Sequence, residues 1–189
     1  MAKRPPVKPP VHVMVDLETL GTSSHAAILS IGAAAFDPWG KGVLDTFVMG
    51  VTLDSALKYG RVDASTIEWW FSPSRADARL RLATHAQEDL DNVLFGFSEW
   101  VRRVADGAQV NLWGNGATFD NVILSNAYAA VGYDRPWSYS GDRCFRTLKN
   151  TSTVKAPKFV GVAHDPLDDT VNQITWLQAI VKRQDLRVL

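Results

Sequence analysis

Three apolar segments rich in β-branched residues constrain the fold of this chain more than any other feature. They cover residues 11–16, 28–36 and 46–51, and stretches of Gly, Ser, Thr, Asp and Pro separate them. Extended segments divided by such turn residues are typical of neighbouring β-strands. The start of the chain therefore predicts a meander of three strands.

The hydrophobic periodicity changes from two towards 3.6 after the third segment, which indicates helices. Seven apolar residues mark one face of a long helix: Leu90, Val93, Leu94, Phe97, Trp100, Val101 and Val104. Residues 110–113 predict a fourth strand, 120–131 a helix that stops at Gly132, and 167–181 a last helix. This order predicts an α/β or α+β domain, with a mixed sheet and flanking helices.

Two carboxylates stand at the end of the first predicted strand. Asp16 and Glu18 lie two residues apart, so their side chains project from the same face of the sheet. The residues before them, 13–15, are apolar, and a buried strand that carries two acids needs a partner for their charges. The pair is either a shared ligand site or a solvated strand end.

Further acids open two of the predicted helices. Asp120 begins one, and Asp165 and Pro166 begin the last helix, directly after His164 and shortly before Asp169. Each group is explained by helix-start chemistry alone, because the helix dipole favours acids there, Asp is a good N-cap and Pro a good first residue. Together they predict one acidic site, since a layered fold brings strand ends and helix starts to the same loops.

These residues resemble the motifs of the DEDDh, or DnaQ-like, 3′-5′ exonucleases of the ribonuclease-H-like superfamily. Residues 16–19 (Asp-Leu-Glu-Thr) resemble the first motif, residues 115–120 the second, N-x-x-x-F-D, and His164 with Asp169 the third, H-x-x-x-x-D. The resemblance spans residues 11–181. Residues 66–70 and 146–148 are similar to the branch of phage exonucleases and bacterial exoribonuclease-like proteins, although Cys144 stands where that branch has an acid.

The resemblance implies a ribonuclease-H-like fold and hydrolysis assisted by two divalent cations, Mg²⁺ or Mn²⁺, about 3.5–4 Å apart. Asp16, Glu18, Asp120 and Asp169 would hold the cations, and His164 would be the general base. The products would be nucleoside 5′-monophosphates, released from a free 3′ end. Four acids this close cannot all ionise without cations, so we expect weak activity without metal.

Six further residues are candidates for contacts with the substrate: Thr19, Leu20, Trp69, Trp70, Asn115 and Phe119. By resemblance, Thr19 and Leu20 would contact the 3′ sugar and wedge the last base. Aromatic faces stack on any base, and Trp69 and Trp70 follow a Ser65-x-x-Glu68 pattern that suggests a capping box. The alternative for each of the two tryptophans is a place in the core.

The kind of nucleic acid is left open by the sequence. The phage-like branch favours single-stranded DNA, and an exoribonuclease is the alternative, because the choice depends on contacts to one 2′-hydroxyl. A non-catalytic nucleic-acid-binding module is a third interpretation, but it would be favoured by the loss of an acid, and none is lost. A phosphohydrolase centred on His164 and Asp165 is disfavoured, because it needs more histidines and only His12, His25 and His85 remain.

Length and composition complete the expectations. The 189 residues fit one domain of about 150 residues, which we place at 11–189, and the 20 basic and 20 acidic residues give no net charge. Residues 1–10 predict a flexible, proline-rich basic arm, which either contacts phosphates or stays a solvated tail. The single cysteine favours a reducing cytoplasm, and no apolar stretch is long enough to cross a membrane. A homodimer is expected from the family alone.

Overall fold

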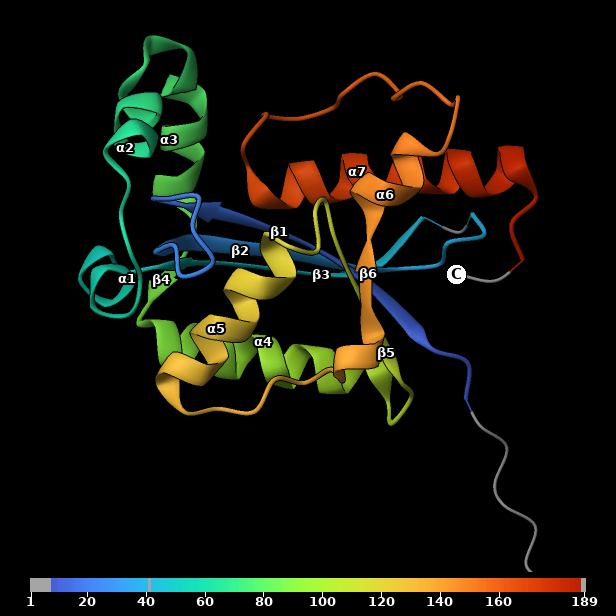
Figure 1. Cartoon of the computed structure of the whole chain (residues 1–189), viewed down its shortest axis with the longest axis horizontal. Coiled ribbons are helices and arrows are strands. Elements are labelled where there is room, and N and C mark those ends of the chain that lie inside the picture. Colours follow the sequence, from blue (N-terminus) through green and yellow to red (C-terminus); the bar gives the residue numbers. More distant parts are fainter. Residues whose placement is uncertain (1–7, 41, 188–189) are drawn as a thin grey trace, which may run out of the picture.

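The computed structural model describes residues 8–40 and 42–187, which form a six-stranded mixed sheet with helices on both faces (Figure 1). The strands are β1 (Val11–Thr19), β2 (Ile28–Phe36), β3 (Val43–Val51), β4 (Gln87–Glu88), β5 (Val110–Gly114) and β6 (Asp142–Cys144), in the sheet order β4-β3-β2-β1-β5-β6. The pairs β1-β2 and β2-β3 are antiparallel, which confirms the meander. The pairs β1-β5, β5-β6 and β3-β4 are parallel.

Seven α-helices are described: α1 (Leu53–Tyr59), α2 (Ala64–Phe71), α3 (Ala76–Thr84), α4 (Leu90–Ala105), α5 (Asp120–Val131), α6 (Phe145–Asn150) and α7 (Pro166–Gln184). The expected helices correspond to α4, α5 and α7, and Gly132 ends α5 in the left-handed conformation, φ 78°. The predicted capping box at Ser65 is not formed. Asp63 is the N-cap of α2, and Ser65 lies inside the helix.

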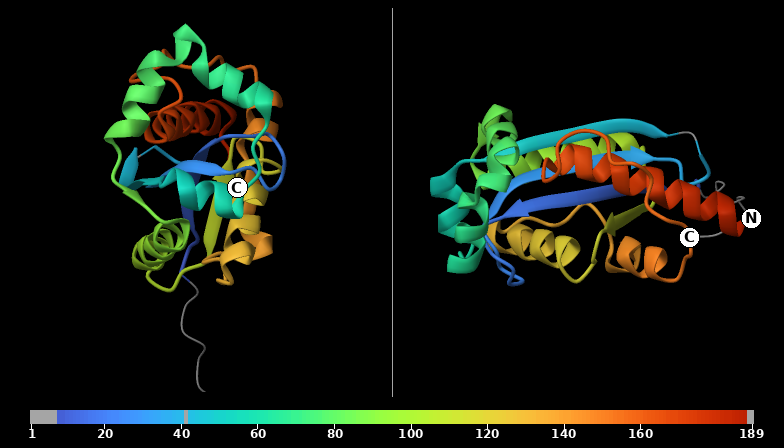
Figure 2. Two further views of the ribbon diagram at one scale, coloured as in Figure 1. Left: turned by 90° about the vertical axis from the view of Figure 1, so that its left-hand side faces the viewer. Right: turned by 90° about the horizontal axis from the view of Figure 1, so that it is seen from above.

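The two faces of the sheet carry separate apolar clusters, because neighbouring residues of β1 point to opposite sides. Val13 and Val15 pack with α4 and α5 on one face, and Met14 packs with α6 and α7 on the other. Figure 2 shows α7 and α4 on opposite sides of the sheet. The predicted layered α/β fold is confirmed.

The start of α7 is fixed against the sheet, and this positions the last acidic motif. Asp165 is the N-cap, its side chain accepts hydrogen bonds from the backbone N–H groups of Leu167 and Asp168, and Pro166 is the first helical residue, as predicted. A Cβ at Gly32 on β2 would lie 2.3 Å from the carbonyl carbon of Pro166. Only glycine at this position lets the helix begin so close to the strand.

The short helices α2 and α3 stand together at one end of the sheet, beside the start of α7 (Figures 1 and 2). Helix α3 is tied to α7 through Asp165, whose Oδ2 lies 3.0 Å from Nε2 of His85 and 3.3 Å from Nε of Arg81. Buried acids of this kind need such partners. Helix α2 is tied to α3 by Arg79, which donates a hydrogen bond to the carbonyl of Trp70. The ties hold α2, and with it Trp69, close to the last acidic motif.

Most of the expected N-terminal arm, residues 1–7, lies outside the described residues. Lys8, in the rest of the arm, pairs with Asp106 at 2.6 Å on the surface. None of the helices in the described ranges has the length and the apolar character that a membrane crossing requires.

Candidate active site

Three elements bring the predicted carboxylates to one cavity of about 370 Å³. Asp16 and Glu18 lie on β1, Asp120 is the first residue of α5, and Asp169 lies in the first turn of α7. All four acids line the cavity, together with His164. The grouping that the sequence predicted is therefore present in the structure.

The parallel pairing of β1 with β5 explains why the first two motifs meet. Val15 pairs with Gly114, so Asp16 comes level with the turn that leads into α5. A Cβ at Gly114 would lie 2.4 Å from Oδ1 of Asn121 and 3.0 Å from Cβ of Asp120. Glycine is required here, because it allows the first turn of α5 to approach the strand and present Asp120 beside Asp16.

The third motif is a compact local unit. The backbone N–H of His164 donates a hydrogen bond of 2.8 Å to Oδ2 of Asp169, and His164 adopts a left-handed backbone conformation with φ 67°. This conformation is uncommon for a residue with a side chain and is often found at functional sites. One ligand atom each of Glu18, His164 and Asp169 lie within 4.8 Å of one another.

Burial and mutual repulsion make the ionised forms of these acids unfavourable without a counter-charge. Burial is the largest cause in each case, and it raises the pKa of Asp120 to about 7 and that of Asp169 to about 6. The pKa values of Asp16 and Glu18 are raised well above their ordinary values by burial and then by the neighbouring carboxylates. An arrangement of this kind requires either protons or cations.

The donor set fits divalent cations that prefer oxygen ligands, such as Mg²⁺ and Mn²⁺. Four carboxylates converge on one cavity, and Nε2 of Gln173 donates a 2.7 Å hydrogen bond to Oδ1 of Asp16, which fixes that carboxylate. Oδ1 of Asn115 and Oε1 of Gln173 are buried in the same wall without a hydrogen-bond partner among the described residues. These two oxygens are further acceptors at the site.

His164 is suited to accept a proton. Its ring packs edge to face on Trp69, with 4.8 Å between the ring centroids, and the side chain is partly buried. Burial and then the positive charge of Arg75 lower the pKa of His164 below its ordinary value of 6.5. The imidazole is therefore neutral at pH 7 and has a free lone pair for a proton.

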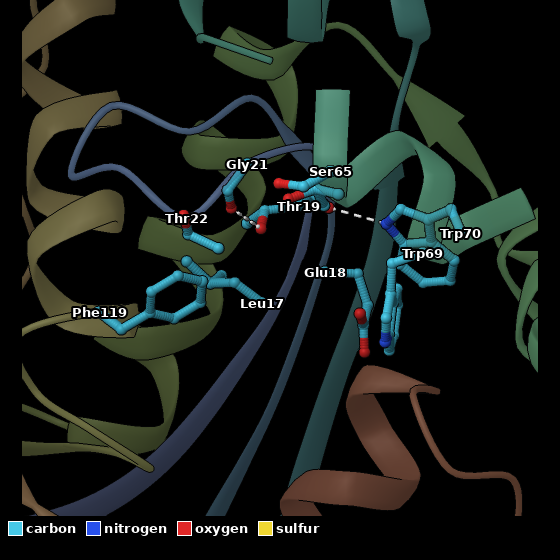
Figure 3. A pocket seen from close by; sticks show the side chains of 10 residues that line it. Leu17, Glu18, Thr19, Gly21, Thr22, Ser65, Trp69, Trp70 and Phe119 are labelled. Carbon is cyan, nitrogen blue, oxygen red and sulfur yellow. Dashed lines mark hydrogen bonds between the residues drawn. The ribbon is translucent and has the colours of Figure 1, made fainter. Parts of the chain in front are cut away.

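A second cavity, of about 390 Å³, continues from the acidic one and shares Leu17, Glu18 and Phe119 with it. Figure 3 shows Trp69 and Phe119 on opposite sides of this cavity, with Glu18 between them. The guanidinium of Arg75 lies 4.3 Å from the ring centroid of Trp69. The cavity therefore offers two aromatic walls directly beside the carboxylates.

A family model described as the 3′-5′ exoribonuclease Rv2179c-like domain matches residues 11–181. The chain belongs to this family. The matched residues are those over which the sequence resembled the DEDDh exonucleases, and that resemblance is confirmed.

Relatives of this exonuclease-family chain agree with the assignment. An exodeoxyribonuclease of Enterobacteria phage T4 is 30% identical over 122 residues, which are 59% of this chain and 52% of the phage protein. Exonuclease I of E. coli, solved with single-stranded DNA, has a TM-score of 0.62 at 15% identity over 94% of this chain and 42% of its own. The nuclease domain of 3′hExo, a DEDDh family member bound to rAMP, has a TM-score of 0.61 at 15% identity, over 93% of this chain and 92% of that domain.

The match to the phage enzyme is partial in length. The chain spans about half of the phage protein, 52%, and less than half of exonuclease I, 42%. The 3′hExo nuclease domain, by contrast, is covered almost completely. At 15% identity the two solved structures show that the family domain has the same fold.

Five of the six candidate substrate residues line the aromatic or the acidic cavity. Thr19, Trp69 and Phe119 line the second cavity, and Asn115 lines the acidic one. Trp70 forms part of the wall but is 5% exposed, and its indole N–H donates to the carbonyl of Thr19 at 2.9 Å (Figure 3). Its ring therefore offers little surface to a base.

The expected wedge at Leu20 is not supported by the structure. Leu20 is 7% exposed and belongs to the core, and it lines neither cavity. Its backbone N–H donates to the carbonyl of Ala27, because the chain has already turned back after β1. This turn directs the side chain into the core.

The histidines considered for a phosphohydrolase are far from forming a cluster. His12 accepts a hydrogen bond from the indole N–H of Trp113 in the core, His25 lies beside Ser24 on the surface, and His85 contacts Asp165. Among the described residues, the group of ligands found close together is that of Glu18, His164 and Asp169. The alternative site centred on His164 and Asp165 is not formed.

Two site residues were missed by the sequence analysis. Gln173 follows Asp169 by four residues and so lies on the same face of α7, a spacing that could have revealed it. Arg146 on α6 also lines the acidic cavity, and its guanidinium carbon lies 2.9 Å from the point that a Cβ at Gly116 would occupy. Residues 146–148 resembled the phage-like branch, but this resemblance did not show that Arg146 would reach the acidic cavity.

Proposed function

We propose that the chain is a 3′-5′ exonuclease that depends on divalent cations and releases nucleoside 5′-monophosphates from single-stranded ends. The observation that carries this proposal is the convergence of Asp16, Glu18, Asp120 and Asp169 with His164 on one cavity. The second, aromatic cavity beside them provides the place that a terminal nucleotide needs. Membership of an exonuclease family supports the same conclusion.

The four carboxylates would hold two cations, with Mg²⁺ or Mn²⁺ favoured by the oxygen ligands. When bound, the cations supply the positive charge that offsets the acids and the phosphate and that activates the attacking water. The hydrogen bond from Gln173 orients Asp16, and the backbone N–H of His164 orients Asp169.

His164 would take the proton from the attacking water as general base. Its lowered pKa keeps the imidazole neutral at pH 7, and the contact with Trp69 fixes its plane. A positioned base contributes roughly 10²- to 10⁴-fold to a rate. Proton transfer at His164 therefore accounts for a large share of the expected catalysis.

Trp69 and Phe119 would hold the terminal base between them, and Thr19, which lines the same cavity, would contact the sugar. Stacking on aromatic rings is tolerant of base identity. This arrangement suits an enzyme that removes successive nucleotides from any sequence. It also requires the terminal base to be unpaired, which favours single strands.

DNA is the substrate that the phage-like motifs predict, and the phage relative is named an exodeoxyribonuclease. RNA is the second candidate, because the family description that covers residues 11–181 names an exoribonuclease. Discrimination depends on contacts to a single 2′-hydroxyl. A homodimer stays a prediction from the family.

The test is a product ladder from matched single-stranded DNA and RNA oligonucleotides labelled at the 5′ end. We expect stepwise shortening from the 3′ end with Mg²⁺ or Mn²⁺, none with EDTA, and none by Asp120→Ala. The faster substrate identifies the sugar preference. A folded protein that binds the oligonucleotides but shortens neither would refute the proposal and favour a binding module.

A further inference from the structure

A third cavity lies on the other side of the acids from the aromatic cavity. It has a volume of about 220 Å³ and opens between α6, α7 and the connection over residues 151–165. It shares Asn115, Asp169 and Gln173 with the acidic cavity, and it shares no residue with the aromatic one. The carboxylates therefore lie between two separate cavities.

We propose that this cavity holds the nucleotide on the 5′ side of the bond that is cut. The inference rests on the proposed function. If the terminal nucleotide fills the aromatic cavity, the phosphate to be hydrolysed lies at the carboxylates. The strand must then continue away from the terminal nucleotide, and the cavity between α6 and α7 is the adjoining space on that side.

The lining of the cavity suits a nucleobase. Phe159, 40% exposed, lines the cavity from the α6–α7 connection, and the partly buried ring of Trp176 lines it from α7. Trp176 is held edge to face against Phe145, a fully buried core ring, with 5.7 Å between the centroids. Pro157 adds a further apolar surface. Single-strand-binding sites commonly combine aromatic side chains of this kind with a positively charged track for the backbone.

Positive charge for such a track is present at the same place. The ammonium of Lys149 lies 5.2 Å from the ring centroid of Trp176 and 5.5 Å from that of Phe145. Burial, and then the nearby charge of Arg146, lower the pKa of Lys149. Neither cation has an ion-pair partner within the parts of the chain that the structure describes. The negative charge of a phosphate beside Lys149 and Arg146 would offset the repulsion between these two cations.

The wall formed by the α6–α7 connection is held in place although it contains no helix or strand. Asn172 on α7 accepts a hydrogen bond from the backbone N–H of Val160 at 3.0 Å and donates one to its carbonyl at 2.8 Å. The indole N–H of Trp176 donates to the carbonyl of Val154 at 2.9 Å, and Asp168 accepts from the N–H of Val162 at 2.8 Å. The cavity is therefore formed before any ligand enters.

The test compares a substrate that lacks a nucleotide on the 5′ side of the cut bond with one that has it. The p-nitrophenyl ester of thymidine 5′-monophosphate has the terminal nucleotide and the phosphate to be cut, but no nucleotide on the 5′ side. A single-stranded oligonucleotide has both. Lys149→Ala and Phe159→Ala change the proposed site, and Arg102→Ala removes one positive charge from α4, on the opposite face of the sheet.

We expect Phe159→Ala to raise KM for the oligonucleotide about tenfold, the effect of losing one stacked base. Lys149→Ala should also raise this KM, and should lower the dependence of log Kd on log salt concentration by about 0.7, the loss of one phosphate contact to a single strand. Both variants should hydrolyse the ester with a KM like that of the wild type. Arg102→Ala should match the wild type on both substrates.

Two results would overturn the inference. An oligonucleotide KM that is unchanged in both variants would show that the strand does not enter this cavity. Equal increases of KM for the ester and the oligonucleotide would show that the substitutions act through the structure of the acidic site. A wild type that cleaves neither substrate would instead refute the proposed function, on which the inference depends.

Discussion

Asp120 provides a quantitative test of the electrostatic state of the site. Its carboxyl is 4% exposed, and burial raises its pKa from 3.8 to about 7. An acid whose pKa is higher in the folded chain than in the unfolded one stabilises the fold below the unfolded pKa. That stability is lost as the pH rises through the folded pKa. Without metal, the protein should therefore become less stable from pH 5 to pH 8.

The size of the effect follows from the pKa. Each pH unit over which Asp120 is protonated in the folded chain and ionised in the unfolded one costs about 1.4 kcal/mol. Between pH 5 and a pKa of about 7 this amounts to about 3 kcal/mol. For a chain of this size it corresponds to about 6 to 12 °C in Tm.

The assay is thermal unfolding of the wild type and Asp120→Asn in EDTA, at intervals from pH 5 to pH 8. From pH 5 to pH 8, the unfolding free energy of Asp120→Asn should rise by about 3 kcal/mol relative to that of the wild type. Asp54→Asn, an exposed acid in the first turn of α1, is the matched control and should follow the wild type. A difference between Asp120→Asn and the wild type that stays constant with pH would refute the reasoning.

Four further substitutions test other parts of the account. His164→Ala should lower the hydrolysis rate by roughly 10²- to 10⁴-fold, and an unchanged rate measured at saturating substrate would exclude a role as general base. Trp69→Ala should weaken oligonucleotide binding by about 1 to 3 kcal/mol. Trp70→Ala should instead lower the unfolding free energy by about 3 to 5 kcal/mol, and denaturation and binding assays of both variants would show whether the two effects separate in this way. Gly32→Ala should lower both stability and activity, because its Cβ would displace Pro166; urea denaturation equal to that of the wild type would contradict this.

The sequence predicted the elements whose signal is local. The second strand, 28–36, has the predicted bounds because its residues are mostly apolar and it lies between two neighbouring strands. The first strand continues three residues beyond the predicted end at Asp16, because Leu17, Glu18 and Thr19 pair with β2. Polar residues interrupt the apolar pattern there, and the pairing with β2 holds these residues in the extended conformation.

The region of α2 shows what local signals cannot decide. Asp63 precedes the helix, but its carboxylate accepts hydrogen bonds from the backbone N–H and hydroxyl of Thr22 instead of capping the helix. Trp69 and Trp70 are neighbours on this helix and point in different directions, so one of them faces the core. Contacts with β1, distant in sequence, determine that it is Trp70.

The acidic site was predictable because each motif is tied to the end of a strand or the start of a helix. The spacing of Gln173 from Asp169 was a usable local signal, whereas the position of Arg146 at the same cavity depends on how α6 packs, which short-range patterns do not contain. The same reason explains why the cavity between α6 and α7 is visible only in the structure.

The most direct test of the central claim is calorimetric titration of Mn²⁺ into the metal-free wild type and Asp16→Asn at pH 7.5, in two buffers of different ionisation enthalpy. The account predicts binding of two cations per chain with release of protons, because the pKa values of the acids are raised in the empty site. It also predicts that Asp16→Asn loses this binding. The absence of Mn²⁺ binding to the wild type, or equal binding by the variant, would contradict the assignment of these carboxylates as a metal site.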